Sequence, residues 1–378
     1  MATPYLGSLG RLLEVLSRDQ PRTLSYARCR AGGPAAWREQ ARAALLERMD
    51  FSPEHVPLDP QVLARIPADG YTRDTVEFAS TRHHRLRGEL LLPSEGYPPF
   101  PAVLALHDHG GFYSHGREKL VQGLSQSQAL LDFVARAYEG RFWASELARR
   151  GYAVLVIDAL GWGERRLAEE DLPAPLRRRL RRWPQDSLEW AGIFNTHAGQ
   201  VAPVLDHNAS FAGLSWMGVV LWDDRRSLEY LLSVPEVDPG RIACAGLSGG
   251  GWRSTYLFGA EPRLAAAGVV GWMARLQDQL HHPVRAHLGL HTAPSVFRAL
   301  DHPDVAAIGA PRPLLVLQCE QDELFSMEAM RLACDDLCQV YADWGHPERF
   351  DARFYDVPHS FTRRMQEELF AWLDQWLR

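Results

Sequence analysis

From residue 70 onward, short apolar runs alternate with longer amphipathic stretches. The continuous runs at 102–106 and 152–157 are typical of strands that are buried on both faces. Strand patterns lie at 75–79, 86–92, 102–106, 152–157, 242–245, 264–270, 313–318 and 350–355, and helical patterns lie at 142–150, 223–234, 327–342 and 362–377. Strands that alternate with helices predict an α/β fold with a mostly parallel sheet covered by helices on both faces.

Two stretches depart from this alternation. Residues 1–70 have mainly helical patterns and end in several prolines, so we expect an N-terminal helical extension packed on a main domain, 71–378. Its role is structural or substrate-lining. Residues 160–221 follow the fourth strand without any strand rhythm, and stretches of this length inside a compact domain are usually functional. We therefore expect a partly helical insertion near the active site, whose tryptophans form either core or an aromatic wall.

The composition is that of a soluble globular protein. The chain has 378 residues, 46% hydrophobic and 23% charged, with a net charge of −6, which gives no nucleic-acid footprint. A basic cluster at 177–182 is most simply a solvated helix face. The five cysteines are scattered, the N-terminus has no secretory pattern, and no apolar stretch could span a bilayer. We expect a cytoplasmic protein without membrane or nucleic-acid partners; a homo-oligomer stays open.

The segment 241–252 has the pattern of a strand, a tight glycine turn and a helix. Its centre, Gly246-Leu-Ser-Gly-Gly250, matches G-x-S-x-G, in which the positions two before and two after the serine need minimal side chains. Such a turn exposes the Ser248 hydroxyl at the carboxyl end of the sheet. A phosphate-binding glycine loop is the alternative, but no P-loop lysine follows. Ser248 is therefore the candidate nucleophile.

A serine nucleophile needs a general base, and the base needs an orienting acid. In this type of site the chain order is serine, acid, histidine. Asp322 lies a few residues beyond the strand 313–318, with Glu320 and Glu323 as rivals. His359 lies between the last strand and the last helix, so it is the candidate base.

Acyl transfer also needs hydrogen-bond donors for the developing oxyanion. The amide of Gly249, directly after the serine, is one candidate. The second donor is expected in the glycine-rich loop after the strand 102–106, and the sequence does not choose among the amides of Gly110, Gly111 and Phe112.

A metal site is the competing reading of the histidines. The candidates are His107, Asp108, His109 and His115 in one loop, and His281, His282, His287 and His291 in another. Histidines in loops are more often hydrogen-bonded anchors. A metallohydrolase would also leave the ordered serine, acid and histidine unexplained, so we expect no metal and no cofactor.

Further motifs accompany this set in chain order: His107-Asp-His-Gly-Gly-Phe112, Gly116-Arg-Glu-Lys119, Asp158-Ala-Leu-Gly-Trp-Gly-Glu164, Asp223-Asp-Arg-Arg-Ser-Leu-Glu-Tyr-Leu231, Val237-Asp-Pro-Gly-Arg-Ile242 and Ala310-Pro-Arg-Pro313. With them the chain resembles the α/β-hydrolase superfamily, in its dienelactone-hydrolase-like and acetylxylan-esterase-like branch. The resemblance covers roughly residues 70–378. It implies an eight-stranded sheet and a Ser248–Asp322–His359 triad that works without a metal or organic cofactor.

The function expected from the residues and the resemblance is hydrolysis of carboxylic esters through an acyl-enzyme, including small esters and acetylated sugars. An alternative keeps the triad but cleaves a C–C or amide bond. A second alternative is a catalytically inactive binding protein, although no member of the triad is missing. The substrate is a small molecule in either enzymatic reading.

Overall fold

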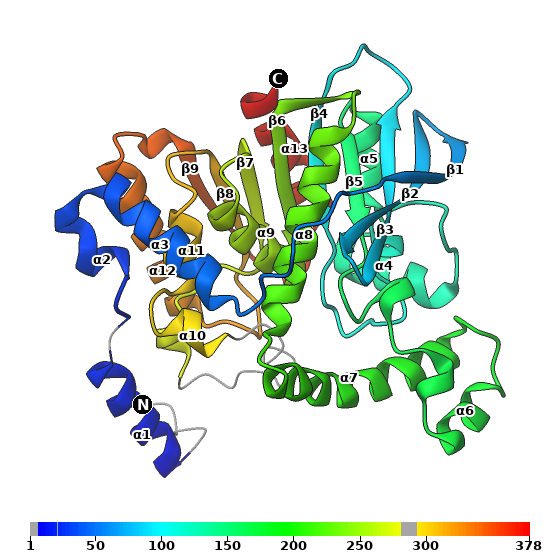
Figure 1. The fold of residues 1–378 in the computed structure, drawn as a ribbon, viewed down its shortest axis with the longest axis horizontal. Coiled ribbons are helices and arrows are strands. Elements are labelled where there is room, and N and C mark those ends of the chain that lie inside the picture. Colours follow the sequence, from blue (N-terminus) through cyan, green and yellow to red (C-terminus); the bar gives the residue numbers. More distant parts are fainter. Residues whose placement is uncertain (1–6, 21, 281–292) are drawn as a thin grey trace.

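The computed structural model describes residues 7–20, 22–280 and 293–378 (Figure 1). Within them, nine strands form one mixed sheet in the order β1-β2-β3-β5-β4-β6-β7-β8-β9. The strands are β1 (Gln61–Ala68), β2 (Tyr71–Thr81), β3 (His84–Pro93), β4 (Phe100–Leu106), β5 (Ala153–Ile157), β6 (Val237–Leu247), β7 (Ala266–Val270), β8 (Leu314–Cys319) and β9 (Phe350–Tyr355). β1, β2 and β3 pair antiparallel, and all pairs from β5 to β9 are parallel.

The predicted α/β sheet is confirmed, and each of the eight predicted strands falls on one of β2 to β9. The ninth strand, β1, corrects both the strand count and the expectation that residues 1–70 are helical. Nearly all of its side chains are exposed, so the sequence carries no buried face to reveal it. Its register shifts between Val62 and Ala64, and it contains Pro67, which is tolerated in an edge strand.

Helices cover both faces of the sheet. One apolar core joins the sheet to α3 (Pro34–Arg48), α8 (Trp216–Ser233), α9 (Gly249–Ala260), α11 (His302–Ala307) and α12 (Met327–Asp343). A second core joins the opposite face to α4 (Gln128–Tyr138), α5 (Trp143–Arg149) and α13 (Arg363–Leu377). The central strands β4 and β5 are buried along their whole length, as their continuous apolar runs predict.

The N-terminal extension consists of α1 (Ser8–Asp19), α2 (Tyr26–Cys29) and α3. Trp37 and Leu45 of α3 are buried in the core shared with α9 and α11, whereas α1 lies apart from the sheet (Figure 1) and exposes Leu9 and Leu12. Most of the extension's buried surface is therefore in α3, which acts as an added layer of the main domain.

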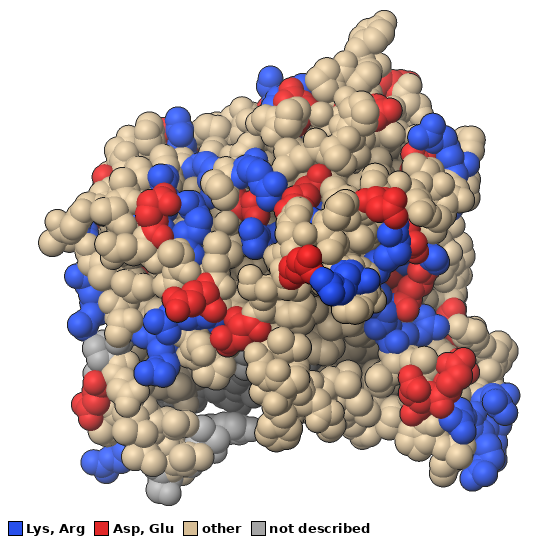
Figure 2. Space-filling model, in the orientation of Figure 1, with Lys and Arg blue, Asp and Glu red and all other residues tan. Residues whose placement is uncertain are grey.

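The insertion after β5 is helical and has a small core of its own. It contains α6 (Ala174–Leu180) and the long α7 (Leu188–Phe211), which crosses below the sheet edge where β6 ends (Figure 1). Trp162 and Trp190 are buried in this core, while Trp183 is 42% exposed. The arginines at 178, 179, 181 and 182 are exposed at its outer end, as expected for a solvated face (Figure 2).

The remaining short helices are α10 (Pro294–Phe297) and several single turns of 3-10 helix. Of the helices described in residues 7–280 and 293–378, none combines the length and the apolarity that crossing a bilayer requires.

Candidate active site

The segment with the serine turn has the geometry that the sequence predicts. β6 ends at Leu247, Ser248 has φ 57°, and α9 begins at Gly249. A positive φ is strained for a residue with a side chain, and such strain is typical of functional turns. The Ser248 amide donates to the carbonyl oxygen of Val270 at 2.8 Å, which ties the turn to the end of β7.

The two flanking glycines are required by close packing. A Cβ atom at Gly246 or Gly250 would collide with the carbonyl oxygen of Leu106, at the end of β4. The Gly246 Cβ would also lie 2.8 Å from the Cα of Gly250. The strand β4 and the turn therefore approach each other through bare backbone, which is the physical reason for the G-x-S-x-G spacing.

The predicted base and acid are in contact. His359 Nδ1 lies 2.6 Å from Asp322 Oδ2, and the other carboxylate oxygen accepts from the amide of Leu324 at 2.7 Å. The Asp322 side chain is fully buried. Because Asp322 binds at Nδ1, the proton of neutral His359 lies there and Nε2 is left as an acceptor. Nε2 is buried and has no hydrogen-bond partner.

His359 and Ser248 meet the same short stretch of chain. A Cβ atom at Gly271 would lie 3.2 Å from His359 Cε1, and Ser248 is hydrogen-bonded to the preceding residue, Val270. The rival acid Glu320 instead faces Arg331 at 3.7 Å. His359 therefore contacts Asp322, and both His359 and the serine turn lie beside the end of β7.

The loop after β4, residues 107–119 and called the β4 loop below, meets the serine turn through His109. A Cβ atom at Gly249 would lie 2.8 Å from the amide nitrogen of His109. These two residues also line a small hollow of about 20 Å³ together with Trp162, Trp216 and Arg253.

The loop positions predicted for the oxyanion line a second hollow of the surface. Gly110, Gly111 and Phe112 line a separate groove of about 460 Å³ between α4 and α7. The amide of Gly111 donates to His109 Nδ1 at 3.0 Å, and that of Phe112 donates to the His109 carbonyl at 3.3 Å. Gly249 instead lies against His109, so the His109 amide joins the candidate oxyanion donors.

Buried polar side chains hold the start of the β4 loop through hydrogen bonds. Lys119 Nζ lies 2.9 Å from the Asp108 carbonyl oxygen, 3.3 Å from Asp108 Oδ2 and 3.3 Å from the His109 carbonyl oxygen. The Tyr138 hydroxyl donates to Asp108 Oδ1. Burial lowers the pKa of Lys119, and the nearby Asp108 carboxylate opposes this effect. Nothing in the sequence predicts this role for Lys119 beyond its place at the end of the motif Gly116-Arg-Glu-Lys119.

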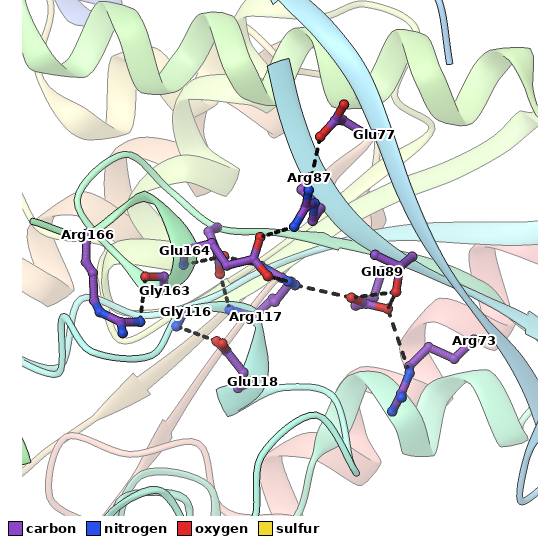
Figure 3. A network of polar contacts seen from close by, with 12 residues as sticks. Arg73, Glu77, Arg87, Glu89, Gly116, Arg117, Glu118, Gly163, Glu164 and Arg166 are labelled. Atoms are coloured by element: carbon purple, nitrogen blue, oxygen red, sulfur yellow. Dashed lines mark hydrogen bonds and ion pairs between the residues drawn. The ribbon is translucent and has the colours of Figure 1, made fainter. Parts of the chain in front are cut away.

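A second network holds the distal part of the loop (Figure 3). Arg117 forms ion pairs with Asp158, with Glu164 at 2.6 Å and with Glu89 at 3.3 Å, and its amide donates to Asp158 Oδ1 at 2.7 Å. Burial, with a smaller contribution from Asp158, raises the pKa of Glu118 to about 7. The loop is therefore anchored to β3 and to the chain after β5.

The insertion is attached to the same loop. Asn195 of α7 accepts from the Ser114 amide at 2.8 Å, and its own amide group donates to the Ser114 hydroxyl at 3.2 Å. Arg166 donates to the Ser114 carbonyl at 3.2 Å. Tyr113 stacks on Trp162 with ring centroids 4.9 Å apart. The insertion thus touches the predicted active site through the β4 loop.

The metal alternative concerns the histidines of two loops. Across residues 7–20, 22–280 and 293–378, no group of three or more potential ligands is arranged for a metal ion. His107 Nδ1 lies 2.8 Å from the Asp108 carbonyl, and its Nε2 accepts from the Ala159 amide, so this histidine anchors the loop. The histidines at 281, 282, 287 and 291 lie outside the described residues.

Comparison with known proteins supports the same fold. A family model described as "Abhydrolase family" matches residues 4–174. YtaP of Bacillus subtilis (strain 168), whose name assigns it to the hydrolases without a substrate, is 22% identical over 347 residues, which are 90% of this chain and 100% of that protein.

Solved structures extend the likeness. One from Bacteroides fragilis NCTC 9343, provisionally named an acetyl xylan esterase, has a TM-score of 0.70 at 18% identity, covering 93% of this chain and 83% of that one. A glucuronoyl esterase from Solibacter usitatus has a TM-score of 0.57 at 16% identity, covering 90% and 92%. An acetyl xylan esterase from Paenibacillus sp. R4 has a TM-score of 0.51 at 18% identity, covering 90% and 94%. The chain has the α/β-hydrolase fold.

Proposed function

We propose that the protein is a serine hydrolase that cleaves carboxylic esters through an acyl-enzyme. The observation that carries this proposal is the 2.6 Å contact between His359 Nδ1 and Asp322, which leaves Nε2 as a proton acceptor beside the strained serine turn. A serine hydroxyl becomes a useful nucleophile only with such an oriented base.

In the first half-reaction, His359 Nε2 takes the proton of Ser248 while Oγ bonds to the ester carbonyl carbon. The carbonyl oxygen becomes an oxyanion, which the Gly249 amide at the start of α9 stabilises. His359 then returns the proton to the departing alcohol as the C–O bond breaks. In the second half-reaction, a water molecule gives its proton to His359 and releases the acid, and Ser248 regains its proton.

Esters are the favoured substrates because the structural relatives named above are esterases, two of which carry names that refer to xylan. We therefore propose small esters and esters of sugars as the substrate class, and a cytoplasmic site of action.

The test is hydrolysis of p-nitrophenyl acetate, acetylated xylose and methyl glucuronate by the wild-type protein and by Ser248→Ala. We expect Ser248→Ala to lose activity on the order of 10⁴–10⁶-fold. Ser254→Ala is the matched control, because the Ser254 hydroxyl only donates to the Gly250 carbonyl within the same helix. A fluorophosphonate should label the wild-type protein at Ser248. Wild-type turnover by Ser248→Ala would refute the proposal.

A further inference from the structure

We propose that the second oxyanion donor is the amide of His109 and that Lys119 is the residue that positions it. This inference rests on the proposed ester hydrolysis and specifies how its transition state is bound. It makes Lys119 a positioning residue, since its ammonium group contacts the peptide unit that carries the donor and not the substrate.

The location of the His109 amide supports this assignment. Among the residues that follow β4, His109 is the one whose amide nitrogen a Cβ atom at Gly249 would meet, at 2.8 Å. An oxyanion attached to Ser248 and bound by the Gly249 amide would lie close to that nitrogen. In contrast, the Gly111 and Phe112 amides donate back to His109, and Gly110 lines the groove between α4 and α7.

The orientation of an amide N–H is set by its whole peptide unit. The His109 N–H belongs to the same planar group as the Asp108 carbonyl. That carbonyl accepts from Lys119 Nζ at 2.9 Å and from His107 Nδ1 at 2.8 Å. His107 Nε2 accepts from the Ala159 amide, so the imidazole proton is at Nδ1 and His107 is a true donor. Two donors on the oxygen fix the plane and polarise the N–H on the opposite side.

The charge of Lys119 is what distinguishes it from an ordinary loop anchor. The side chain is fully buried, and its counter-charge, Asp108 Oδ2, lies 3.3 Å away. Asp108 is held in turn by the Tyr138 hydroxyl. A buried cation on the carbonyl side of the peptide increases the partial positive charge of the N–H, and hydrogen bonds that involve an ion are stronger than neutral ones.

The experiment compares Lys119→Met with Tyr138→Phe, which removes a buried hydrogen bond from the same network but leaves both donors on the Asp108 carbonyl. Measured quantities are kcat, KM and the inhibition constant of an aryl trifluoromethyl ketone, which forms an oxyanion on the serine. We expect Lys119→Met to lower kcat about 10²–10³-fold with KM nearly unchanged, and to raise the inhibition constant by a similar factor. Tyr138→Phe should change each less than about 10-fold.

Lys119→Gln is the second variant, because it keeps an N–H donor without the charge and decides the question if Lys119→Met does not fold. We expect it to lie between the wild type and Lys119→Met in kcat and in inhibitor affinity. An unchanged inhibition constant in a folded Lys119 variant would overturn the inference, and so would equal losses in Tyr138→Phe. Wild-type turnover by Ser248→Ala would instead refute the proposed function itself, so the two failures are distinct.

Discussion

Two loops meet at the predicted nucleophile, and they are held by opposite means. The serine turn, 246–250, is shaped by missing side chains: glycines allow its backbone to touch the end of β4. The β4 loop is shaped by buried charges, with Lys119 on Asp108 and Arg117 on Asp158 and Glu89. The first device depends on steric contact over five residues, whereas the second depends on partners distributed over β3, β5 and α4.

This difference has an energetic consequence. A turn that is held by close backbone contacts, such as 246–250, tolerates almost no added side-chain volume, and its stability does not depend on charge. A buried ion-pair device is sensitive to the loss of either partner, because the remaining charge is left in a medium of low polarity. Added side-chain volume should therefore destabilise the serine turn, whereas the loss of one charged partner should destabilise the β4 loop.

The largest expected effect on stability is in the β4 loop. Arg117→Met leaves Asp158 and Glu89 buried without their main cation, so we expect the free energy of unfolding to fall by about 3–5 kcal/mol. Arg87→Met is the matched control, because Arg87 is 43% exposed and its pairs with Glu77 and Glu164 are worth about 1 kcal/mol or less. Urea denaturation measures both. Similar losses for the two variants would show that burial of the network is not what stabilises the loop.

Added volume in the serine turn should have the next effect. In Gly250→Ala the new methyl group would collide with the Leu106 carbonyl oxygen and lie 2.8 Å from the Leu106 carbonyl carbon. We expect a loss of up to about 3 kcal/mol in the free energy of unfolding, together with lower esterase activity. Gly192→Ala in α7 is the control. A Cβ atom there meets nothing within 4 Å, so helix propensity should raise stability by up to about 1 kcal/mol. A fully stable and active Gly250→Ala protein would contradict the steric account.

A buried group without partners gives the smallest effect. His302 lies among Tyr256, Trp272 and Phe297, neither ring nitrogen has a hydrogen-bond partner, and burial lowers its pKa to about 4. An unfolded histidine titrates near 6.5, so the folded protein loses stability as the pH falls from about 6.5 to about 4.

His302→Phe should remove that loss. The stability of the variant relative to the wild type should be about 2 kcal/mol more favourable at pH 5 than at pH 8, measured by urea denaturation. The same difference at both pH values would show that the pKa of His302 in the folded protein is not lowered from that of an unfolded histidine.

The sequence predicts the parallel half of the sheet well, because β4, β5, β7 and β8 are apolar runs that are buried along their whole length. It does not reveal β1, whose exposed side chains carry no such signal. The sequence predicts a partly helical insertion but not the 24-residue length of α7, because Pro203 lies inside that helix and the apolar side chains of Val204 and Phe211 are exposed.

The candidate active site also has a part that the sequence predicts and a part that it does not. Ser248, Asp322 and His359 can be predicted because the nucleophile turn is a local motif and the acid and base follow strand ends in a set order. The contact between Lys119 and Asp108 could not be predicted from spacing, because it depends on how the loop folds against α4. The predicted oxyanion positions 110–112 directly follow His109 in the chain, and glycine positions alone do not distinguish the amides of neighbouring residues in a folded loop.

The Asn195–Ser114 contact links the β4 loop to the insertion. Because a side chain of α7 binds the backbone amide of Ser114 in the β4 loop, sequence changes in the insertion and in that loop are not independent of each other. A chimaera that receives the insertion of a relative should retain turnover only when the donor segment has, at the position of Asn195, a side chain that can hydrogen-bond to Ser114. A graft of residues 160–221 that aims to change substrate specificity must therefore preserve the hydrogen bonds to Ser114 as well as change the pocket.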